Sequence, residues 1–478
     1  MDTNIPKQRK LFYGWWIVLG GFLLMATCYT MFVNGVPLFQ KHIISDLNFT
    51  MAQFNTGVSL CTVVAVFASL AFRAMVNKLS ARLLGSATVI IAAIVLLLFS
   101  FITELWHFYA LCVIAGMIVV AGTRLLASVL TTNWFTFRRG LAVSIALSGS
   151  GFGGAVLSPV ISATIVGYGW RTAYLVLAVI TLVAALPVII TSFYNQPSDK
   201  GLLPYGLNDP EQTRVKKNKA KEDKSSDTSV NISVGWKTLR KSSGFWILII
   251  GLVCMGIVNG AVITNSVTNM TSVTLNDVEI ITGGHSDIWA GRVWSLYLIV
   301  VIFAKVLLGF IYDRWGLKTG TVLGTTACII ACIALCFPAT SWGPIVAAVA
   351  FGFGTCMGTV TPPIMVVKEY GKKDLALVVG IATAFELFGA AIGAVLSGVL
   401  FDVFHSFIPA WLMGLVASFL MGVTLLKSIP EAQKIVARSQ AEGAPLLDEE
   451  GFEIVAQPYG GVLPKPHDDI PLQPFSSP

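Results

Sequence analysis

Long apolar runs alternate with short polar intervals along most of this chain. Each run is close to the ~20 residues that an α-helix needs to cross a bilayer. One much longer polar interval separates the sixth run from the seventh. The pattern therefore predicts twelve membrane-spanning helices in two groups of six, at 13–34, 51–73, 83–103, 107–133, 140–166 and 170–193, then at 245–268, 288–312, 319–338, 342–367, 374–400 and 406–427.

The interval 195–243 differs in composition from the runs that flank it, because it holds ten Lys and Arg among Ser, Asp, Asn and Pro. Such a segment cannot bury enough apolar surface to fold by itself. We expect an N-terminal six-helix bundle at 1–194, a basic cytoplasmic linker at 195–243 and a C-terminal six-helix bundle at 244–429. The remainder, 430–478, is expected to be a disordered cytoplasmic tail.

The composition supports an all-α membrane protein. The 478 residues are 55% hydrophobic and 12% charged, whereas soluble domains carry roughly 25% charged residues. Placing both termini in the cytoplasm puts most of the 32 Lys and Arg on that side, as the positive-inside rule requires. The exceptions are Lys41, Arg124, Arg171, Arg292 and Lys305. The net charge of +7 is thus a topology signal for a plasma or inner membrane, and no nucleic-acid partner is expected.

An internal repeat is visible at a fixed offset of 236 residues. The segment 73–82, after the second predicted helix, aligns with 309–318, after the eighth. The same offset pairs Gly122-Thr123 with Gly358-Thr359, and Gly153 with Gly389. Several coincidences at one offset indicate a duplicated chain. In transporters built from such repeats, the substrate site lies between the halves near the bilayer midplane.

The second copy of this loop resembles the motif G-x-x-x-D-[RK]-x-G-x-[RK] of the major facilitator superfamily at every defined position. The matching residues are Gly309, Asp313, Arg314, Gly316 and Lys318. We expect Gly309 to let helices approach closely, and the charged pair to form a gating contact at the cytoplasmic helix ends. A simple tight turn with solvated charges is the alternative interpretation.

The first copy of the loop departs from the motif. Arg73 and Ser80 stand where the motif has glycine, and Asn77 stands where it has aspartate. In most members of the superfamily the first copy is the stronger one. This departure puts the gating role of the first copy in doubt.

Several local strings are similar to the group that contains monocarboxylate porters and oxalate:formate antiporters. Taken one at a time, their aromatics are ordinary interfacial anchors and their glycines ordinary helix-packing residues. Their joint order carries the resemblance, which implies a major facilitator fold and transport of organic anions by alternating access. The strings are Phe12-Tyr-Gly-Trp-Trp16, Asn133-Trp-Phe135, Arg138-Arg-Gly-Leu-Ala142, Ser148-Gly-Ser-Gly-Phe-Gly-Gly154 and Gly244-Phe-Trp246.

Three ionisable residues fall near mid-depth of predicted helices, where a charge is costly and marks a functional site by default. Arg124 and Glu386 share their helix faces with small or hydroxylated residues, which predicts that both point into a cavity. Lys305 has larger apolar neighbours, so that snorkelling to the headgroups is an alternative for it. Asn259 and Tyr29 are further cavity candidates, or else polar residues in helix packing.

The resemblance to oxalate:formate antiporters refines the expected substrate. Those proteins carry an arginine in helix eight, four residues before the motif glycine, and a lysine in helix eleven, six residues after a glycine. The matching positions here are Lys305, which keeps the positive charge, and Glu386, counted from Gly380, which reverses it. A site built for a dianion would lose much of its attraction through this reversal, so oxalate is disfavoured.

Our hypothesis from the sequence is a secondary transporter of organic anions, most simply monocarboxylates, with proton coupling or anion exchange. Arg124 and Lys305 would hold the carboxylate. Glu386 would take up a proton, or pair with Lys305 when the site is empty, because desolvation favours the neutral form of a carboxyl group.

Three other functions stay open at this point: transport of bulkier amphipathic carboxylates such as sterol (bile) acids, efflux of drugs or other solutes, and a transporter-like receptor or scaffold. The pairing of one helix glutamate with two cations argues against cationic drugs. An enzyme is not expected, because the chain carries no nucleotide loop, metal cluster or nucleophile elbow, and we expect no cofactor and no metal.

Overall fold

The computed structural model describes residues 12–135, 139–205, 236–275, 278–370 and 375–441, together with three short strands close to the C-terminus. Eleven helical stretches among these residues are long and apolar enough to cross a membrane. The longest, Leu141–Ser192, is interrupted at Gly169, whose φ of 84° and ψ of 162° are not helical. This stretch therefore holds two spans, and the described residues supply the twelve spans that the sequence predicts.

The described residues of the first half form ten helical elements. The π-helical turns η1 and η2 interrupt what would otherwise be continuous membrane helices. The elements are α1 (Gly14–Leu24), η1 (Met25–Tyr29), α2 (Thr30–Val33), α3 (Val36–Leu47), α4 (Met51–Lys78), α5 (Ala81–Phe99), α6 (Leu105–Ile118), η2 (Val119–Leu125), α7 (Leu126–Trp134) and α8 (Arg139–Ser192).

The second half repeats this helical layout and adds a β-hairpin. Its first long helix, α11, is followed by the two antiparallel strands of the hairpin. The elements are η3 (Pro197–Lys200), α10 (Trp236–Leu239), α11 (Ser243–Met270), β1 (Ser272–Leu275), β2 (Val278–Ile281), α12 (Asp287–Arg314), α13 (Gly316–Leu335), α14 (Trp342–Gly354), α15 (Cys356–Tyr370), α16 (Leu375–Phe404) and α17 (Ile408–Ala441), followed by β3 (Leu446–Leu447), β4 (Glu453–Ala456) and β5 (Val462–Pro464).

Serine residues begin several of the membrane helices. The hydroxyls of Ser80, Ser242 and Ser286 accept hydrogen bonds from backbone N–H groups in the first turns of α5, α11 and α12. Such caps satisfy N–H groups that have no partner within the helix. The outer surface of the helices is apolar, and Phe303 and Val306 are 70% and 73% exposed. A bilayer accepts such side chains, whereas water would not.

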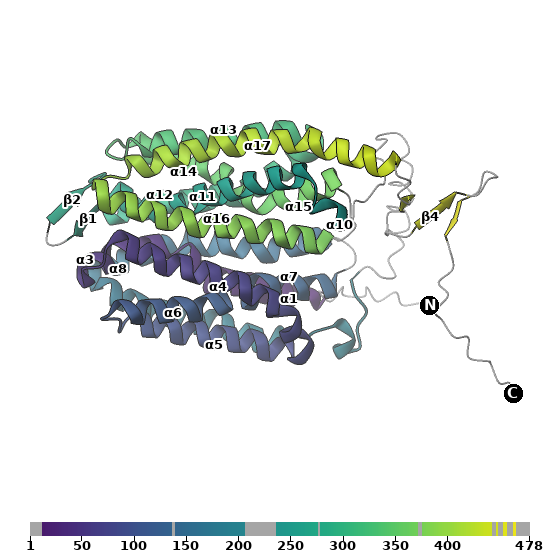
Figure 1. The fold of residues 1–478 in the computed structure, drawn as a ribbon. Coiled ribbons are helices and arrows are strands. Elements are labelled where there is room, and N and C mark those ends of the chain that lie inside the picture. Colours follow the sequence, from purple (N-terminus) through teal and green to yellow (C-terminus); the bar gives the residue numbers. More distant parts are fainter. Residues whose placement is uncertain are drawn as a thin grey trace, which may run out of the picture.

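The helices of the two halves form two layers, purple to blue for the first half and teal to green for the second (Figure 1). Within each half, a glycine identified by the repeat brings two helices into backbone contact. A Cβ atom on Gly153 would lie 2.1 Å from the carbonyl oxygen of Ala26, and one on Gly389 would lie 2.3 Å from that of Val253. Any larger side chain would force these helices apart, so the repeat pairs residues with the same packing role.

The two halves are joined at the end of the molecule where the β1–β2 hairpin lies, which we call the hairpin end (Figure 1). Helix α4 packs against α16, α8 packs against α12, and α3 packs against α11. Every hydrogen bond or ion pair that we find between the halves, within the described residues, lies at this end or near mid-depth. The deepest of these bonds along α4 runs from Ser59 Oγ to the Ala391 carbonyl, over 2.8 Å.

A cluster of buried, uncharged polar side chains lies within this interface, and we call it the amide cluster. Gln40 Nε2 donates to Asn55 Oδ1 over 2.8 Å and to Asn265 Oδ1 over 2.9 Å. Thr268 Oγ1 donates to Gln40 Oε1 over 2.5 Å, and Asn265 Nδ2 donates to Ser397 Oγ over 2.8 Å. All five side chains are fully buried, so each bond replaces one that water would otherwise supply.

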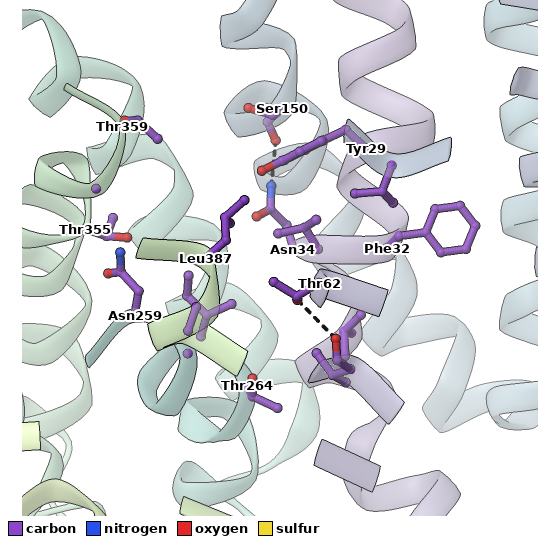
Figure 2. A pocket seen from close by; sticks show the side chains of 18 of the residues that line it. Tyr29, Phe32, Asn34, Thr62, Ser150, Asn259, Thr264, Thr355, Thr359 and Leu387 are labelled. Atoms are coloured by element: carbon purple, nitrogen blue, oxygen red, sulfur yellow. Dashed lines mark hydrogen bonds between the residues drawn. The ribbon is translucent and has the colours of Figure 1, made fainter. Parts of the chain in front are cut away.

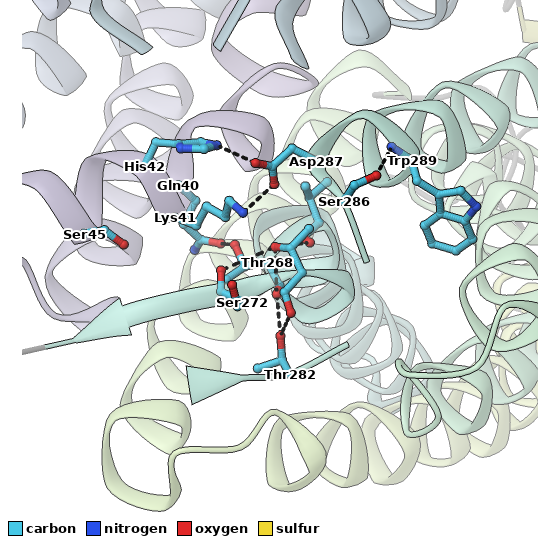
Figure 3. Close-up of polar contacts among 12 residues, drawn as sticks. Gln40, Lys41, His42, Ser45, Thr268, Ser272, Thr282, Ser286, Asp287 and Trp289 are labelled. Carbon is cyan, nitrogen blue, oxygen red and sulfur yellow. Dashed lines mark hydrogen bonds and ion pairs between the residues drawn. The ribbon is translucent and has the colours of Figure 1, made fainter. Parts of the chain in front are cut away.

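Charged contacts lie beside the amide cluster, closer to the hairpin (Figure 3). Lys41 Nζ lies 2.5 Å from Asp287 Oδ1, and His42 Nε2 lies 3.5 Å from Asp287 Oδ2. Asp402 at the end of α16 accepts hydrogen bonds from the backbone N–H groups of Met51 and Ala52. The carboxylate thereby meets the positive end of the α4 helix dipole, which favours a negative charge.

The predicted boundaries of the linker and of the tail need correction. The start of the linker packs on the first half: Tyr205 N donates to the Trp134 carbonyl over 2.9 Å, and Lys200 Nζ lies 3.7 Å from the centre of the Tyr13 ring. Helix α17 continues through Pro430 to Ala441, so the expected tail begins twelve residues too early. Residues 206–235 of the linker and most of the tail lie outside the described part of the chain.

Candidate functional site

A cavity of about 210 Å³ lies between the two halves near mid-depth. All five residues that the sequence predicted for the substrate site line it: Tyr29, Arg124, Asn259, Lys305 and Glu386. Tyr29 and Arg124 come from the first half, and the other three come from α11, α12 and α16 of the second. Figure 2 shows the Tyr29 and Asn259 side chains on facing sides of this space.

The first-half residues of the site lie in the two π-helical turns. Tyr29 is the last residue of η1, and Arg124 is the second-last residue of η2. A π turn inserts one residue into an α-helix, and such turns are frequent at functional sites. Threonine hydroxyls bond to carbonyls next to both turns, from Thr30 to Met25 and from Thr123 to Val119. These side-chain bonds compete with the regular backbone ladder.

Arg124 and Lys305 are the cations of the cavity, and each is partly exposed to it. Within the described residues, neither has a carboxylate within 4 Å, and neither makes a side-chain hydrogen bond. The two positive charges line the same cavity. Like charges in a region of low dielectric repel strongly, and an anion between them relieves the repulsion.

Glu386 is 7% exposed and is bonded to Asn259, which is 6% exposed. Asn259 Nδ2 donates to Glu386 Oε1 over 3.2 Å. The ion pair between Glu386 and Lys305, one of the two alternatives expected for Glu386, is not formed in the described part of this structure. A buried carboxylate without a cation is costly, and the neutral carboxylic acid avoids that cost.

The other carboxamide atom of Asn259 has no partner. Asn259 Oδ1 is buried, and no hydrogen-bond donor in the described residues reaches it. An unsatisfied buried acceptor of this kind costs about 1–3 kcal/mol. Gly358 provides the space for the Asn259–Glu386 pair, since a Cβ atom there would lie 2.8 Å from Asn259 Nδ2 and 2.9 Å from Glu386 Oε1.

Apolar side chains and a few neutral polar ones complete the cavity. Phe32 and Leu387 contribute apolar surface, Thr359 contributes a hydroxyl from α15, and Thr355 contributes one from the turn between α14 and α15 (Figure 2). Asn34 lies beside them and donates to the Ser150 carbonyl over 3.0 Å. The sequence analysis missed these neutral residues, because an isolated Thr or Asn in a helix gives no signal that separates lining a cavity from packing.

The loop motif lies away from the cavity, at the end of the molecule opposite the hairpin. Gly316 has a φ of 83°, a conformation that favours glycine, and Arg314 and Lys318 are exposed. A Cβ atom on Gly309 would meet no other atom within 4 Å. The expected close approach of helices at Gly309 is therefore wrong for this conformation. The Asp313 side chain lies outside the described part.

A second buried carboxyl group escaped the sequence analysis. Glu369 is 6% exposed near the end of α15, two residues beyond the predicted end of that span. Ser428 Oγ of α17 donates to its Oε1 over 3.1 Å. The argument that the helices hold a single glutamate was wrong for this reason. Glu369 does not line the cavity.

The chain is similar in sequence to several transporters. Monocarboxylate transporter 12-B of Danio rerio is 31% identical over 173 residues, which cover 34% of this chain and 35% of that protein. Riboflavin transporter RibJ of Trypanosoma brucei brucei is 24% identical over 209 residues, 41% of this chain and 36% of that protein. The chain thus matches only about a third of the length of these two relatives. Monocarboxylate transporter 13 of Rattus norvegicus is 23% identical over 446 residues, 91% of this chain and 94% of that protein.

Solved structures share the fold. A bacterial homolog of the human lysosomal transporter Spinster, in an inward-facing and unoccupied conformation, aligns with a TM-score of 0.59 at 15% identity, over 91% of this chain and 99% of that one. A D-xylose-proton symporter aligns with a TM-score of 0.59 at 14% identity, over 88% and 98%. At this identity the likeness establishes the fold alone.

The family model described as Major Facilitator Superfamily matches residues 17–276 and 283–459, which is most of the chain. It covers both groups of helices and the cavity between them. The duplicated twelve-helix layout, the intact second loop motif and the similarity to transporters along the chain agree with this match. This chain therefore belongs to the Major Facilitator Superfamily and is a multi-pass membrane transporter.

Proposed function

We propose that this transporter moves small monocarboxylates across the membrane, either together with a proton or in exchange for another carboxylate. One observation carries the proposal: Arg124 and Lys305 enter the same cavity from opposite halves, and neither has an anionic partner within the described residues. A carboxylate accepts hydrogen bonds from both kinds of cation, and an arginine can bind it through two parallel bonds.

In this mechanism the carboxylate bridges the halves of the transporter. Arg124 belongs to the first half and Lys305 to the second, so an anion held by both favours the conformation in which the halves approach each other. Glu386 takes up the proton, since it is buried in the wall of the same cavity and no cation among the described residues is paired with it. Tyr29 and Asn259 supply neutral polar surface on either side of the cavity.

The size of the cavity and the relatives favour compact substrates. A volume of about 210 Å³ is below the roughly 300–1,000 Å³ of sites for drug-sized ligands, which argues against sterol acids in this conformation. Two of the relatives described above are named monocarboxylate transporters, and one of them aligns along nearly its whole length. The riboflavin transporter supplies an alternative substrate that the experiment must include.

The test is uptake of labelled compounds into proteoliposomes that contain the purified protein. The panel runs from formate and lactate through branched and aromatic monocarboxylates to a bile acid and riboflavin. Each compound is measured with an imposed pH gradient and, separately, with unlabelled substrate preloaded inside. We expect the pH gradient to stimulate uptake of small monocarboxylates. Uptake of riboflavin alone, or of none of these compounds, would contradict the proposal.

The variant Glu386→Gln tests the role of the proton. It keeps the size of the side chain but cannot be ionised, so we expect pH-driven uptake to fall to the level without a gradient while exchange is retained. Glu279→Gln in the hairpin is the matched control, because Glu279 lies outside the cavity and bonds only to Ser272 in the described residues. Full stimulation by the pH gradient in Glu386→Gln would eliminate Glu386 as the proton acceptor.

A further inference from the structure

The buried carboxamide oxygen of Asn259 accepts no hydrogen bond in the described residues, which raises the question of which group could donate one. In the observed arrangement, Asn259 Nδ2 donates to Glu386 Oε1, while Asn259 Oδ1 is buried without a partner. This pattern serves an ionised Glu386, which can only accept hydrogen bonds. The same burial, without a cation within 4 Å in the described residues, disfavours the ionised form.

Protonation of Glu386 supplies the missing donor. A carboxylic acid carries one O–H donor, and a half-turn of the Asn259 carboxamide places its oxygen where its nitrogen was. The acid can then donate to Asn259 Oδ1, and the proton comes from water in the cavity. No bond other than this O–H bond is made or broken.

We propose that Asn259 is a positioning residue that bonds to Glu386 in both protonation states, donating to the carboxylate and accepting from the acid, and so holds α11 to α16 throughout the cycle. This inference rests on the proton-accepting role proposed above for Glu386. It extends that role by naming the group that keeps the carboxyl oriented toward the cavity when its charge changes.

The packing around the pair favours such an exchange. Gly256 and Gly260 of α11 lie directly against the α16 backbone. A Cβ atom on Gly256 would lie 2.0 Å from the carbonyl oxygen of Glu386, and one on Gly260 would lie 1.9 Å from that of Ala390. The two helices therefore cannot separate or slide without a large rearrangement. The side chains of Asn259 and Glu386 must accommodate any change of protonation locally.

Other titratable groups line the same cavity without a hydrogen bond to Glu386 in the described residues. They are Tyr29 of η1, Cys61 of α4, Arg124 of η2 and Lys305 of α12. The α15 residue that touches the pair is Gly358, which has no side chain to titrate. Within the described residues, Asn259 is accordingly the one side chain in hydrogen-bond contact with the Glu386 carboxyl.

Infrared difference spectroscopy of the purified protein tests the inference without any substrate. The carbonyl stretch of a protonated Glu386 is identified as the band that appears on acidification in the native protein and is missing in Glu386→Gln. In Asn259→Leu we expect this band to move to higher frequency, because the carboxyl group loses its hydrogen-bond partner. We also expect the pH at which this band reaches half of its full intensity to move by about one pH unit. The reason is that the carboxylic acid and the carboxylate lose hydrogen bonds of different strength when Asn259 is replaced.

Two further variants make the result decisive. Gly358→Ala leaves both side chains intact but inserts a methyl group between them, so it should displace the band in the same direction as Asn259→Leu. Cys254→Ala changes another residue of α11 that does not line the cavity, and it should leave the band unchanged. A band that is unaltered in both Asn259→Leu and Gly358→Ala would overturn the inference, and so would the absence of any Glu386 band in the native protein.

The outcomes separate this inference from the proposed substrate. If the band shifts as expected but no monocarboxylate is transported, the substrate assignment fails and the role of Asn259 stands. If monocarboxylates are transported with a proton but the band is insensitive to Asn259, the inference fails and the proposed function stands.

Discussion

Arg124 and Lys305 carry the same charge but offer a carboxylate different bonds. Arg124 presents a planar guanidinium group that can donate two parallel hydrogen bonds, whereas Lys305 presents a compact ammonium group. Arg124 also lies in a π turn, a local irregularity that is frequent at functional sites. The orientation of the substrate should therefore depend on Arg124 more than on Lys305, and the charge of the cavity should depend on both.

Arg124→Lys tests this difference, because it keeps the charge and removes the planar fork. A hydrogen bond to a charged group contributes about 1.5–3 kcal/mol, so losing one bond should raise KM about 10- to 100-fold. Lys305→Arg, the reciprocal change, keeps the charge and should alter KM less. Uptake kinetics in proteoliposomes measure both values. Equal KM values for Arg124→Lys and the native protein would show that Arg124 does not bind the carboxylate.

The five candidate site residues could be predicted from depth along the helices, because the rise per residue of an α-helix fixes how far each lies from the membrane surface. Their contacts could not be predicted in this way. Glu386 bonds to Asn259 rather than to Lys305 because glycines bring α11 and α16 into backbone contact, and depth carries no information about which helix is adjacent. Glu369 was missed because α15 extends past the last strongly apolar residues.

At the scale of elements, the interface at the hairpin end is the part of the structure that must open for a substrate to pass. It combines the uncharged amide cluster with the partly buried pair of Lys41 and Asp287. Burying a neutral amide costs less desolvation free energy than burying a charged group. An interface built largely from amides can therefore form and separate with a modest change in free energy. The periodicity of the sequence could not reveal it, since Gln40, Asn55 and Asn265 lie on three separate helices.

Cross-linking tests whether this interface must separate during transport. A protein with its native cysteines replaced receives Lys41→Cys and Asp287→Cys, whose native side chains touch across the interface. A short reducible bis-thiol reagent bridging them should stop uptake, and cleaving the reagent should restore it. The control pair, Ser272→Cys with Glu279→Cys, lies within the hairpin and should not block uptake when bridged. Undiminished uptake in the bridged interface variant would mean that the hairpin end does not open.

At the scale of the whole molecule, the two halves meet at the hairpin end (Figure 1), and residues of both halves line the cavity. We propose, from the distribution of Lys and Arg, that both termini lie in the cytoplasm of a cell with this protein in its plasma or inner membrane. The hairpin end then faces outward. The layout of twelve helices, with a break between the predicted spans 140–166 and 170–193, was predictable because each span needs about 20 apolar residues, whereas the non-helical φ of 84° that makes this break at Gly169 was not.

Labelling with a membrane-impermeant thiol reagent tests this orientation. Val278 in the hairpin is 62% exposed and Leu203 at the start of the linker is 58% exposed, and they lie on opposite sides in the proposed topology. In intact cells the reagent should modify Val278→Cys at once and Leu203→Cys only after permeabilisation. Seven of the eight native cysteines are buried, which keeps the background low. The reverse pattern of labelling would invert the topology.

The interruption of the membrane helices beside the cavity has a consequence for the ancestry of this chain. In the first half, the turn η2 begins at Val119. The repeat offset of 236 residues places Thr355 at the equivalent position in the second half, and Thr355 is the residue that separates α14 from α15. Both residues line the cavity. The interruption takes a different form in each copy, a π turn in the first and a single turn residue in the second, but it stands at the same position. We infer that the ancestral half-length protein already departed from a regular α-helix here, so that pairing two copies placed both departures beside the cavity that Arg124 and Glu386 line.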